Sequence, residues 1–245
     1  MQTNRLISYW VVLRSLLATL STSLSVINAS FMRRLTRQRI DQLSRAWSSK
    51  VLKIARVSYE VFNPYTVSLQ SGRSYIIMSN HASLYDIPLI IMSLPGSIRM
   101  IGKKELFKVP IWGRAMRLAD FISIDRENRR QAIQDLQLAK EKMENGVNIW
   151  MAPEGTRSRT GKIQSFKKGG FMLALKTNAV IIPVGIRGAD KILPPKTSNI
   201  QLNQKIEIHI GKPIDTQKYL AAQRDQLMQD VEDSIREAAQ QVLES

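Results

Sequence analysis

The fold is decided by residues 75–89, which read YIIMSNHASLYDIPL. The run from Tyr75 to Met78 is short and apolar, as is typical of a buried strand. Polar residues follow it, and the apolar pattern resumes after Asp86. We therefore expect a buried strand to end just before His81 and a helix to begin near Asp86. Functional side chains of open α/β sheets gather at such strand ends.

Short apolar runs alternate with helical stretches on both sides of this segment. This alternation predicts an α/β domain with a mixed, mostly buried sheet that is flanked by helices. We expect strands at residues 75–79, 98–102, 121–125, 148–151, 180–186 and 205–210. Apolar residues at helical spacing predict helices around residues 133–143, at 171–177 and near the C-terminus, at 220–242.

His81 and Asp86 are five residues apart and form a possible catalytic pair. Across a turn, the carboxylate can approach one imidazole nitrogen and leave the other free to face a substrate. A neutral imidazole can then accept a hydroxyl proton near neutral pH. On its own the pair has a simpler interpretation, in which Asp86 or Ser83 caps a helix and His81 bonds a backbone carbonyl.

Two further clusters follow predicted strands and favour the catalytic interpretation. The segment at residues 151–158 reads MAPEGTRS, where Arg157 offers a fork of donors for phosphate and Gly155 lets backbone amides approach an anion. The segment at residues 102–106 reads GKKEL, and Lys104 is its phosphate candidate. Alternatively, the first cluster is a polar surface turn and the second a solvated helix start.

The three clusters together match a known family. The chain has His-x4-Asp, then Lys-x-Glu-Leu-x3-Pro-x2-Gly, then Pro-Glu-Gly-Thr-Arg-Ser, then an apolar strand that ends in Pro-Val. From about Ser74 to Gly188 it resembles the 1-acyl-sn-glycerol-3-phosphate acyltransferases. The resemblance implies transfer of a fatty acyl group from acyl-CoA or acyl carrier protein to the 2-hydroxyl of lysophosphatidic acid. Phosphatidic acid would be the product, without a metal or cofactor.

The resemblance also implies roles for individual residues. His81 would be the general base and Asp86 its orienting partner. Lys104 would lie near the substrate phosphate, in a substrate-binding set completed by Glu154, Gly155, Thr156, Arg157 and Ser158. The acyl-donor region would contain Ile182, Pro183 and Val184.

Other functions remain open at this stage. An acyltransferase of the same fold could use another acceptor, such as a lyso-ornithine lipid, an amine or a lipid A precursor. A hydrolase would replace the alcohol with water, but the chain has no cysteine and no Gly-x-Ser-x-Gly motif. The net charge of +16 permits a nucleic-acid-binding protein. No recognisable nucleic-acid module accompanies that charge, so we expect no nucleic-acid partner.

Composition narrows the chemistry further. The absence of cysteine excludes disulfides and thiolate metal sites and fits a reducing compartment. The only two histidines are His81 and His209, so a His-rich metal site is not expected. His209 alternates with isoleucines in a predicted strand, which favours an ordinary strand position over catalysis.

The first 57 residues form a basic extension to a predicted acyltransferase domain at residues 58–245. They hold ten basic residues and one acid, Asp41. If the stretch before residue 33 is a helix, one of its faces is apolar, while Arg14, Ser21 and Ser25 lie on another. The apolar face consists of Leu13, Leu16, Leu17, Leu20, Leu24, Ile27 and Phe31. A second basic amphipathic segment covers residues 33–57.

This extension predicts a two-helix unit that docks on membrane phospholipids. Residues 15–32 hold eight Ser, Thr or Asn residues and make a poor bilayer span. The alternatives are a core helix and a signal peptide. Because basic residues flank the apolar face, we expect a monotopic or peripheral protein on the cytoplasmic face of the inner or another membrane, with an anionic leaflet as partner.

Overall fold

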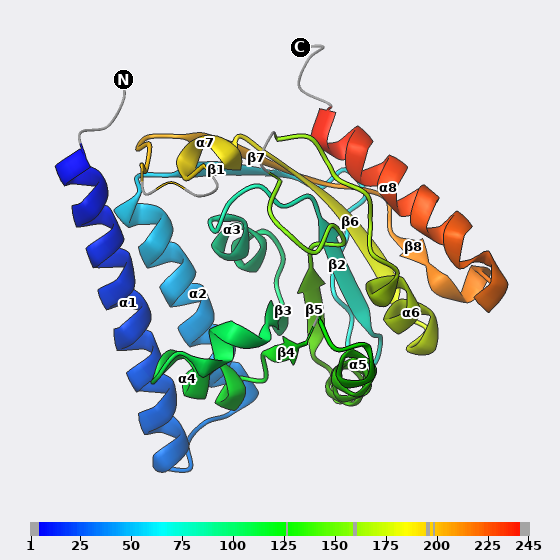
Figure 1. The fold of residues 1–245 in the computed structure, drawn as a ribbon, viewed down its shortest axis with the longest axis horizontal. Coiled ribbons are helices and arrows are strands. Elements are labelled where there is room, and N and C mark those ends of the chain that lie inside the picture. Colours follow the sequence, from blue (N-terminus) through cyan, green and yellow to red (C-terminus); the bar gives the residue numbers. More distant parts are fainter. Residues whose placement is uncertain (1–4, 126, 159–160, 195–196, 198, 241–245) are drawn as a thin grey trace.

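The computed structural model describes residues 5–125, 127–158, 161–194, 197 and 199–240. The strands in these ranges form one sheet in the order β1-β7-β6-β2-β5-β3-β4, and β8 pairs with β6 beside this path (Figure 1). Their bounds are β1 Ser58–Phe62, β2 Tyr75–Ser79, β3 Ile98–Lys103, β4 Ile122–Ile124, β5 Asn148–Met151, β6 Val180–Arg187, β7 Lys205–Ile210 and β8 Ile214–Asp215.

The sheet is mixed, as expected from the sequence. Strands β6, β2, β5, β3 and β4 run parallel, so their carboxyl ends share one edge. β7 is antiparallel to β6, and β1 is parallel to β7. The six predicted strands are confirmed to within two residues at either end. β1 and β8 were not predicted, because β1 is a half-exposed edge strand without a buried apolar run and β8 has only two residues.

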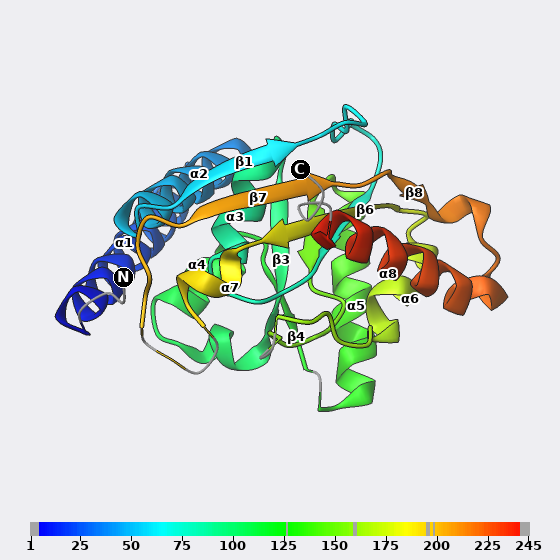
Figure 2. The ribbon, with the colours of Figure 1, turned by 90° about the horizontal axis from the view of Figure 1, so that it is seen from above.

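Helices cover both faces of the sheet (Figures 1 and 2). One core cluster lies between the sheet and the helices on the α1 side, and a second lies against α5, α6 and α8. The bounds are α1 Arg5–Phe31, α2 Arg37–Ile54, α3 Asp86–Ser93, α4 Trp112–Leu118, α5 Arg129–Glu144, α6 Lys168–Lys176, α7 Ala189–Ile192 and α8 Arg224–Gln240, with short 3-10 turns at Lys104–Lys108, Thr216–Lys218 and Ala221–Gln223.

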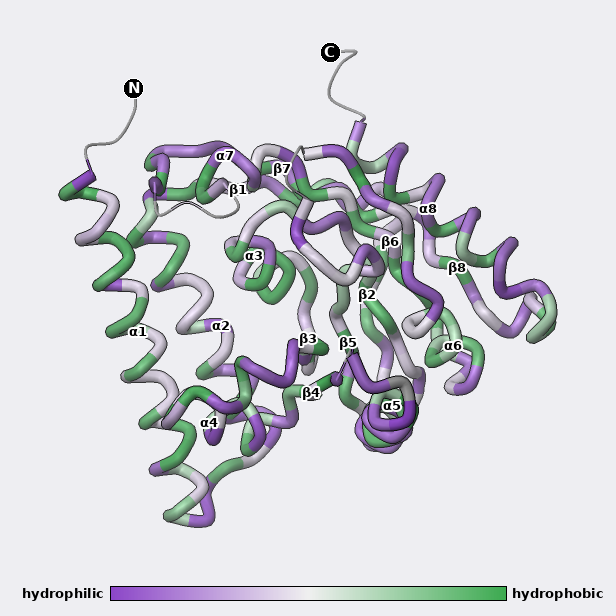
Figure 3. The backbone as a smooth tube through the Cα atoms, in the orientation of Figure 1, coloured by the Kyte–Doolittle hydropathy of each residue, from purple (hydrophilic) through white to green (hydrophobic). Residues whose placement is uncertain are grey.

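The apolar face of α1 points away from the domain. Leu16 is 62% exposed and Phe31 87%, and the other leucines of the face are also exposed. The face that packs inward carries smaller side chains, including Ser8, Val11 and Ala18. The core-helix alternative therefore describes only the inward face of α1, because the leucine face stays outside the core. In Figure 3, hydrophobic residues recur along the whole of α1 and alternate with paler, more polar ones.

α1 is also longer than the stretch that the sequence marked as too polar for a bilayer span. The whole helix has 27 residues, and its most apolar 18-residue window has a mean hydropathy of 1.5 with 22% of it buried. By length and composition alone, it could therefore cross a membrane, a test that soluble core helices and signal sequences can also pass.

The two N-terminal helices are built into the same core as the sheet. The expected boundary at residue 57 does fall between α2 and β1, but Val11, Val51 and Leu52 pack with sheet residues in one cluster. Asp41, the single acid of this region, accepts a hydrogen bond from Arg99 of β3 at 2.7 Å. Arg99 is 1% exposed, so this ion pair fixes α2 to the sheet from inside the protein.

Gly185 of β6 lies directly under the backbone of α8. A Cβ at this position would lie 2.3 Å from the carbonyl carbon of Ala238, which cannot move without displacing the helix. We expect Gly185→Ala to lower the free energy of unfolding by about 3 kcal/mol through overpacking. Urea denaturation measures this. The matched control is Gly169→Ala in α6, where the nearest atom would be 3.9 Å away and stability should not fall.

Candidate active site

His81 lies in the loop that joins the carboxyl end of β2 to α3. Its Nδ1 is 2.7 Å from Oδ2 of Asp86, the first residue of α3. The imidazole is 17% exposed, whereas the carboxylate is 1% exposed. No partner of the other ring nitrogen, Nε2, is found in the described part of the chain. The arrangement predicted from the spacing is therefore present, with one nitrogen held and one open.

Asp86 is held by the turn that it closes. The same oxygen that faces His81 accepts hydrogen bonds from the backbone N–H groups of Ala82 at 2.9 Å and Ser83 at 3.0 Å. Asp86 therefore closes the turn that precedes α3 and holds the imidazole in place. The simpler interpretation is wrong, because α3 has no side-chain cap and Nδ1 of His81 meets a carboxylate and not a backbone carbonyl. A buried carboxylate with fixed donors can stabilise an imidazolium without moving.

Glu154 joins the loop after β5 to the loop that carries His81. Its Oε1 accepts the backbone N–H of His81 and its Oε2 accepts that of Gln164, both at 2.9 Å. The side chain is 1% exposed, and this burial raises its pKa, against the lowering effect of the two hydrogen bonds. The expectation that Glu154 contacts substrate therefore needs correction, because both of its oxygens are engaged inside the protein.

We expect Glu154→Gln to weaken both stability and turnover. An amide keeps one acceptor oxygen but turns an NH2 group toward one of the two backbone donors, which leaves that buried donor unpaired at a cost of about 1–3 kcal/mol. Urea denaturation and steady-state kinetics measure the two effects. Glu60→Gln on the exposed side of β1 is the control, and equal stability of the two variants would contradict the bracing role.

The rest of the segment after β5 divides into two groups. Ser158 is buried, and its backbone N–H donates to the carbonyl of His81 at 2.7 Å, so it braces the loop as Glu154 does. Thr156 is exposed, Arg157 is half-buried, and Gly155 has a φ of +74° that suits glycine. No acceptor for the Arg157 guanidinium is found among the described residues, which leaves it available to an anion.

Trp150 was missed by sequence reasoning. It is buried in β5, and its ring meets that of His81 edge to face, with ring centroids 5.7 Å apart. Its indole N–H donates to Ser79 Oγ at 3.0 Å, which fixes the ring against the end of β2. The sequence did contain a signal for this contact. Trp150 stands near the end of the predicted strand that leads into the Pro-Glu-Gly segment.

Lys104 directly follows β3, which is separated from β2 by β5. Its Nζ bonds Oδ2 of Asp125 at 2.8 Å. This hydrogen bond raises the pKa of Lys104 and lowers that of Asp125. Neighbouring strands are about 4.8 Å apart, so the backbone of β3 lies roughly 10 Å from that of β2, the strand that leads into His81. The structure therefore places Lys104 on the same sheet edge as His81, but already paired with a carboxylate.

The segment at residues 182–184 lies inside β6 and not on a surface. Ile182 and Val184 are 0% exposed and belong to the core on the α1 side of the sheet. Pro183 lies between the residues of β6 that pair with β8 and those that pair with β7, where a missing N–H is tolerated. The expectation that these residues form an acyl-donor region is corrected, since their burial leaves no face for a donor.

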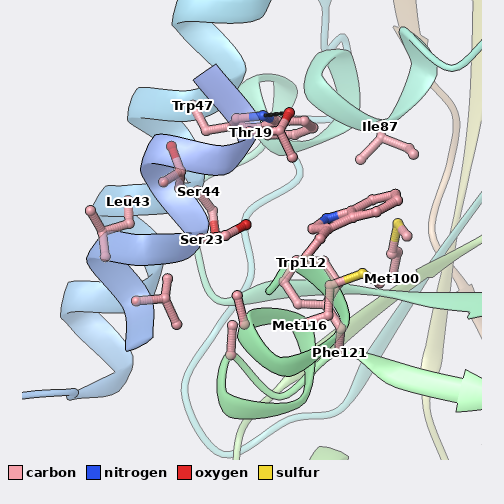
Figure 4. Close-up of a pocket in the computed structure, with 14 residues that line it drawn as sticks. Thr19, Ser23, Leu43, Ser44, Trp47, Ile87, Met100, Trp112, Met116 and Phe121 are labelled. Atoms are coloured by element: carbon pink, nitrogen blue, oxygen red, sulfur yellow. Dashed lines mark hydrogen bonds between the residues drawn. The ribbon is translucent and has the colours of Figure 1, made fainter. Parts of the chain in front are cut away.

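A largely apolar cavity of about 90 Å³ lies where α1, α2, α4 and β3 meet (Figure 4). Trp112, Met100 and Phe121 line one side, and α1 and α2 add a few hydroxyl groups. Ile87, which directly follows Asp86, also lines it. The cavity therefore approaches α3, the helix that carries Asp86.

No group of three or more His, Cys, Asp or Glu side chains that could hold a metal ion occurs among the residues that the structure describes.

Comparison with known proteins agrees with the site. The family model described as acyltransferase matches residues 63–187, which is more than half of the chain. This chain belongs to the acyltransferase family. The matched region contains every site residue predicted from the sequence, from His81 to Val184.

Individual relatives narrow the resemblance. The chain is 34% identical to the chloroplastic 1-acyl-sn-glycerol-3-phosphate acyltransferase of Arabidopsis thaliana, over 57% of this chain and 39% of that protein. It is 34% identical to the Haemophilus influenzae enzyme of the same name, over 59% of each chain. It thus spans about two fifths of the length of the plant relatives that it matches.

A solved structure extends the likeness to the whole chain. The crystal structure of the 1-acyl-sn-glycerophosphate acyltransferase from Thermotoga maritima has a TM-score of 0.84 and 25% identity, and the match covers 99% of this chain and 97% of that one. These matches confirm the resemblance to the 1-acyl-sn-glycerol-3-phosphate acyltransferases and the α/β fold with its N-terminal helices.

Proposed function

We propose that this chain transfers a fatty acyl group from a thioester donor, acyl-CoA or acyl carrier protein, to the 2-hydroxyl of 1-acyl-glycerol-3-phosphate. The observation that carries this proposal is the hydrogen bond of 2.7 Å between His81 and Asp86, which leaves the second ring nitrogen open at the sheet edge. The names of the relatives support the acceptor, since several are 1-acyl-sn-glycerol-3-phosphate acyltransferases.

In the proposed reaction, Nε2 of His81 removes the proton from the acceptor hydroxyl. The oxygen attacks the thioester carbon, the C–S bond breaks, and the leaving thiolate takes the proton back from the imidazolium. The products are an ester and a free thiol, so that His81 returns to its neutral form. Asp86 stabilises the cation between the two steps, and the enzyme needs no nucleophile of its own.

The substrate phosphate needs a cation close to the base. Arg157 fits, because it follows β5, the immediate neighbour of β2, and its planar guanidinium has no competing acceptor in the described residues. Lys104 can contribute although it is paired, because an ammonium has three N–H donors and Asp125 engages one. We assign the apolar cavity beside Ile87 to part of a fatty chain.

The exposed face of α1 supports action at a membrane surface. Bound there by its leucines, the protein would meet lipid substrates without extracting them into water. The basic residues between the end of α1 and the first turn of α2 suit an anionic leaflet, and we place them on the cytoplasmic side. They are Arg33, Arg34, Arg37 and Arg39.

Acylation of a lysolipid panel tests the reaction. Purified full-length protein receives labelled acyl-CoA or acyl carrier protein with lysophosphatidic acid, a lyso-ornithine lipid, an amine and a lipid A precursor. We expect phosphatidic acid as the main product. Failure to acylate lysophosphatidic acid with either donor would overturn the assignment, and preference for another acceptor would redirect it.

Vesicle binding tests the role of α1. Removing the apolar side chains of Leu16, Leu17 and Leu20 with glutamine should weaken binding to anionic vesicles about 100-fold, at roughly 1 kcal/mol for each half-exposed leucine. The matched control replaces with glutamine three other exposed residues that lie outside α1, namely Ile133, Leu138 and Leu220. Equal vesicle binding by both variants, or salt-sensitive binding to DNA in place of vesicles, would contradict the membrane assignment.

A further inference from the structure

A basic pocket lies beside the His81 loop, and its charged side chains are used by neither the sequence motifs nor the proposed reaction. The cavity has about 550 Å³ and is lined by the two chain neighbours of His81, Asn80 and Ala82. Three cationic side chains line it, namely Arg187 at the end of β6, Lys162 in the loop before α6 and Arg236 in α8, against the single carboxylate of Asp190. We call it the Arg187 pocket.

The charge of Arg187 is poorly balanced inside the protein. The side chain is 11% exposed, and its Nε and Nη2 are buried without a hydrogen-bond partner in the described structure. Its one carboxylate neighbour, Glu207, is 3.5 Å away and shares the same oxygen with His209 at 2.9 Å. Burial lowers the pKa of Arg187, opposed by Glu207. Buried donors without acceptors are costly, so such a group favours an anionic ligand.

The other two cationic residues of the pocket, Arg236 and Lys162, differ in the hydrogen bonds that they make. Arg236 already bonds Glu232 at 2.6 Å and the backbone carbonyl of Ile163 at 3.3 Å, so it holds the loop wall against α8. Lys162 is exposed, and its backbone carbonyl accepts the hydroxyl of Ser158, the residue that braces His81. The pocket wall and the catalytic loop are therefore mechanically joined.

We propose that the Arg187 pocket binds a phosphate group of one of the two substrates. This inference rests on the proposed function, because both substrates of that reaction carry phosphate. The shared chemistry is a phosphate with an attached chain, held by guanidinium and ammonium donors. Its two sources are the acceptor's glycerol phosphate and the phosphates of the donor's carrier, and they are separable by experiment.

Binding of soluble phosphate compounds tests the pocket without turnover. Calorimetry on the full-length protein in detergent uses two probes, sn-glycerol 3-phosphate for the acceptor and CoA for the donor. We expect Arg187→Gln to weaken the binding of one probe about 10-fold or more, as the loss of a charge-assisted hydrogen bond predicts. Weakened binding of glycerol phosphate assigns the pocket to the acceptor, and weakened binding of CoA assigns it to the donor.

Lys191→Gln is the matched control. It removes one positive charge from α7, close in sequence to Arg187, but Lys191 does not line the pocket, so the affinity of neither probe should change. If Arg187→Gln fails to fold, Lys162→Gln decides, because Lys162 is exposed on a loop, and we expect a 3- to 10-fold loss for the same probe. Unchanged affinity for both probes in the folded variants would overturn the proposal.

Kinetics separates this inference from the proposed function. In an active enzyme, Arg187→Gln should raise the KM of the substrate whose probe it weakens, by the same factor of about 10 or more. It should leave kcat within about twofold, since the residue acts in binding. A wild-type protein without acyltransferase activity would refute the proposed function. Its phosphate binding, and the effect of Arg187→Gln on that binding, would still be measured independently.

Discussion

His81→Ala should lower kcat for acyl transfer by about 1,000-fold or more, while the protein keeps its fold. The substitution removes the proposed base, and general base catalysis contributes about 100- to 10,000-fold. His81 is partly exposed, so its loss leaves only a small space beside Trp150. Steady-state kinetics with labelled donor gives the loss of kcat, and thermal unfolding shows whether the fold is intact.

The only other histidine of the chain provides the control. His209 lies in β7, stacked on Phe62 with ring centroids 4.5 Å apart and bonded to Glu207. His209→Gln should therefore leave kcat within about twofold. Near-normal turnover by the His81 variant would refute the assigned base, whatever the behaviour of the control.

Asp86→Asn should lower kcat by a similar factor, about 1,000- to 10,000-fold, through a different cause. Aspartate oxygen Oδ2 accepts three hydrogen bonds, two from backbone N–H groups and one from the imidazole. An amide oxygen can still cap the turn, but it carries no charge to stabilise the imidazolium, and an amide NH2 facing Nδ1 would favour the wrong tautomer. The KM values should change little.

The size of the loss and a control complete this test. If Asp86 only closed the turn before α3, asparagine, whose amide oxygen can accept the same two backbone N–H groups, would preserve turnover, so retention of more than a tenth of kcat would contradict the orienting role. The control Asp120→Asn removes a carboxylate that takes no part in the site. Asp120 pairs with Lys142 at 2.5 Å, and its substitution should leave kcat unchanged.

The sequence predicted the elements that have a strong periodic signal. The buried strands were found because each is a short apolar run, and His81 and Asp86 were placed correctly because a strand end and a helix start bracket them. β1 was missed because an edge strand alternates between half-exposed and exposed side chains. The inward face of α1 was missed because it carries small residues such as Ala18, which a hydrophobic pattern does not mark.

The site was predicted less completely than the fold. Motif position cannot distinguish a residue that contacts substrate from one that supports the loop, and Glu154 belongs to the second kind because both of its oxygens meet backbone N–H groups. Burial of Ile182 and the pairing of Lys104 with Asp125 depend on residues far away in the chain. The contact of Trp150 with His81 joins two strands that are neighbours only in space.

The inward face of α1 has a consequence for biosynthesis. Ser8 Oγ accepts the backbone N–H of Ile200 at 3.2 Å, a contact between residues 192 positions apart. A ribosome completes α1 long before it makes β6, β7 or the loop that carries Ile200. During translation the inward face around Ser8 therefore waits for a late partner, whereas α2 and α4 can already pack on the rest of that face. The leucine face stays exposed in the folded domain, so it can meet a bilayer from the moment that the helix is made.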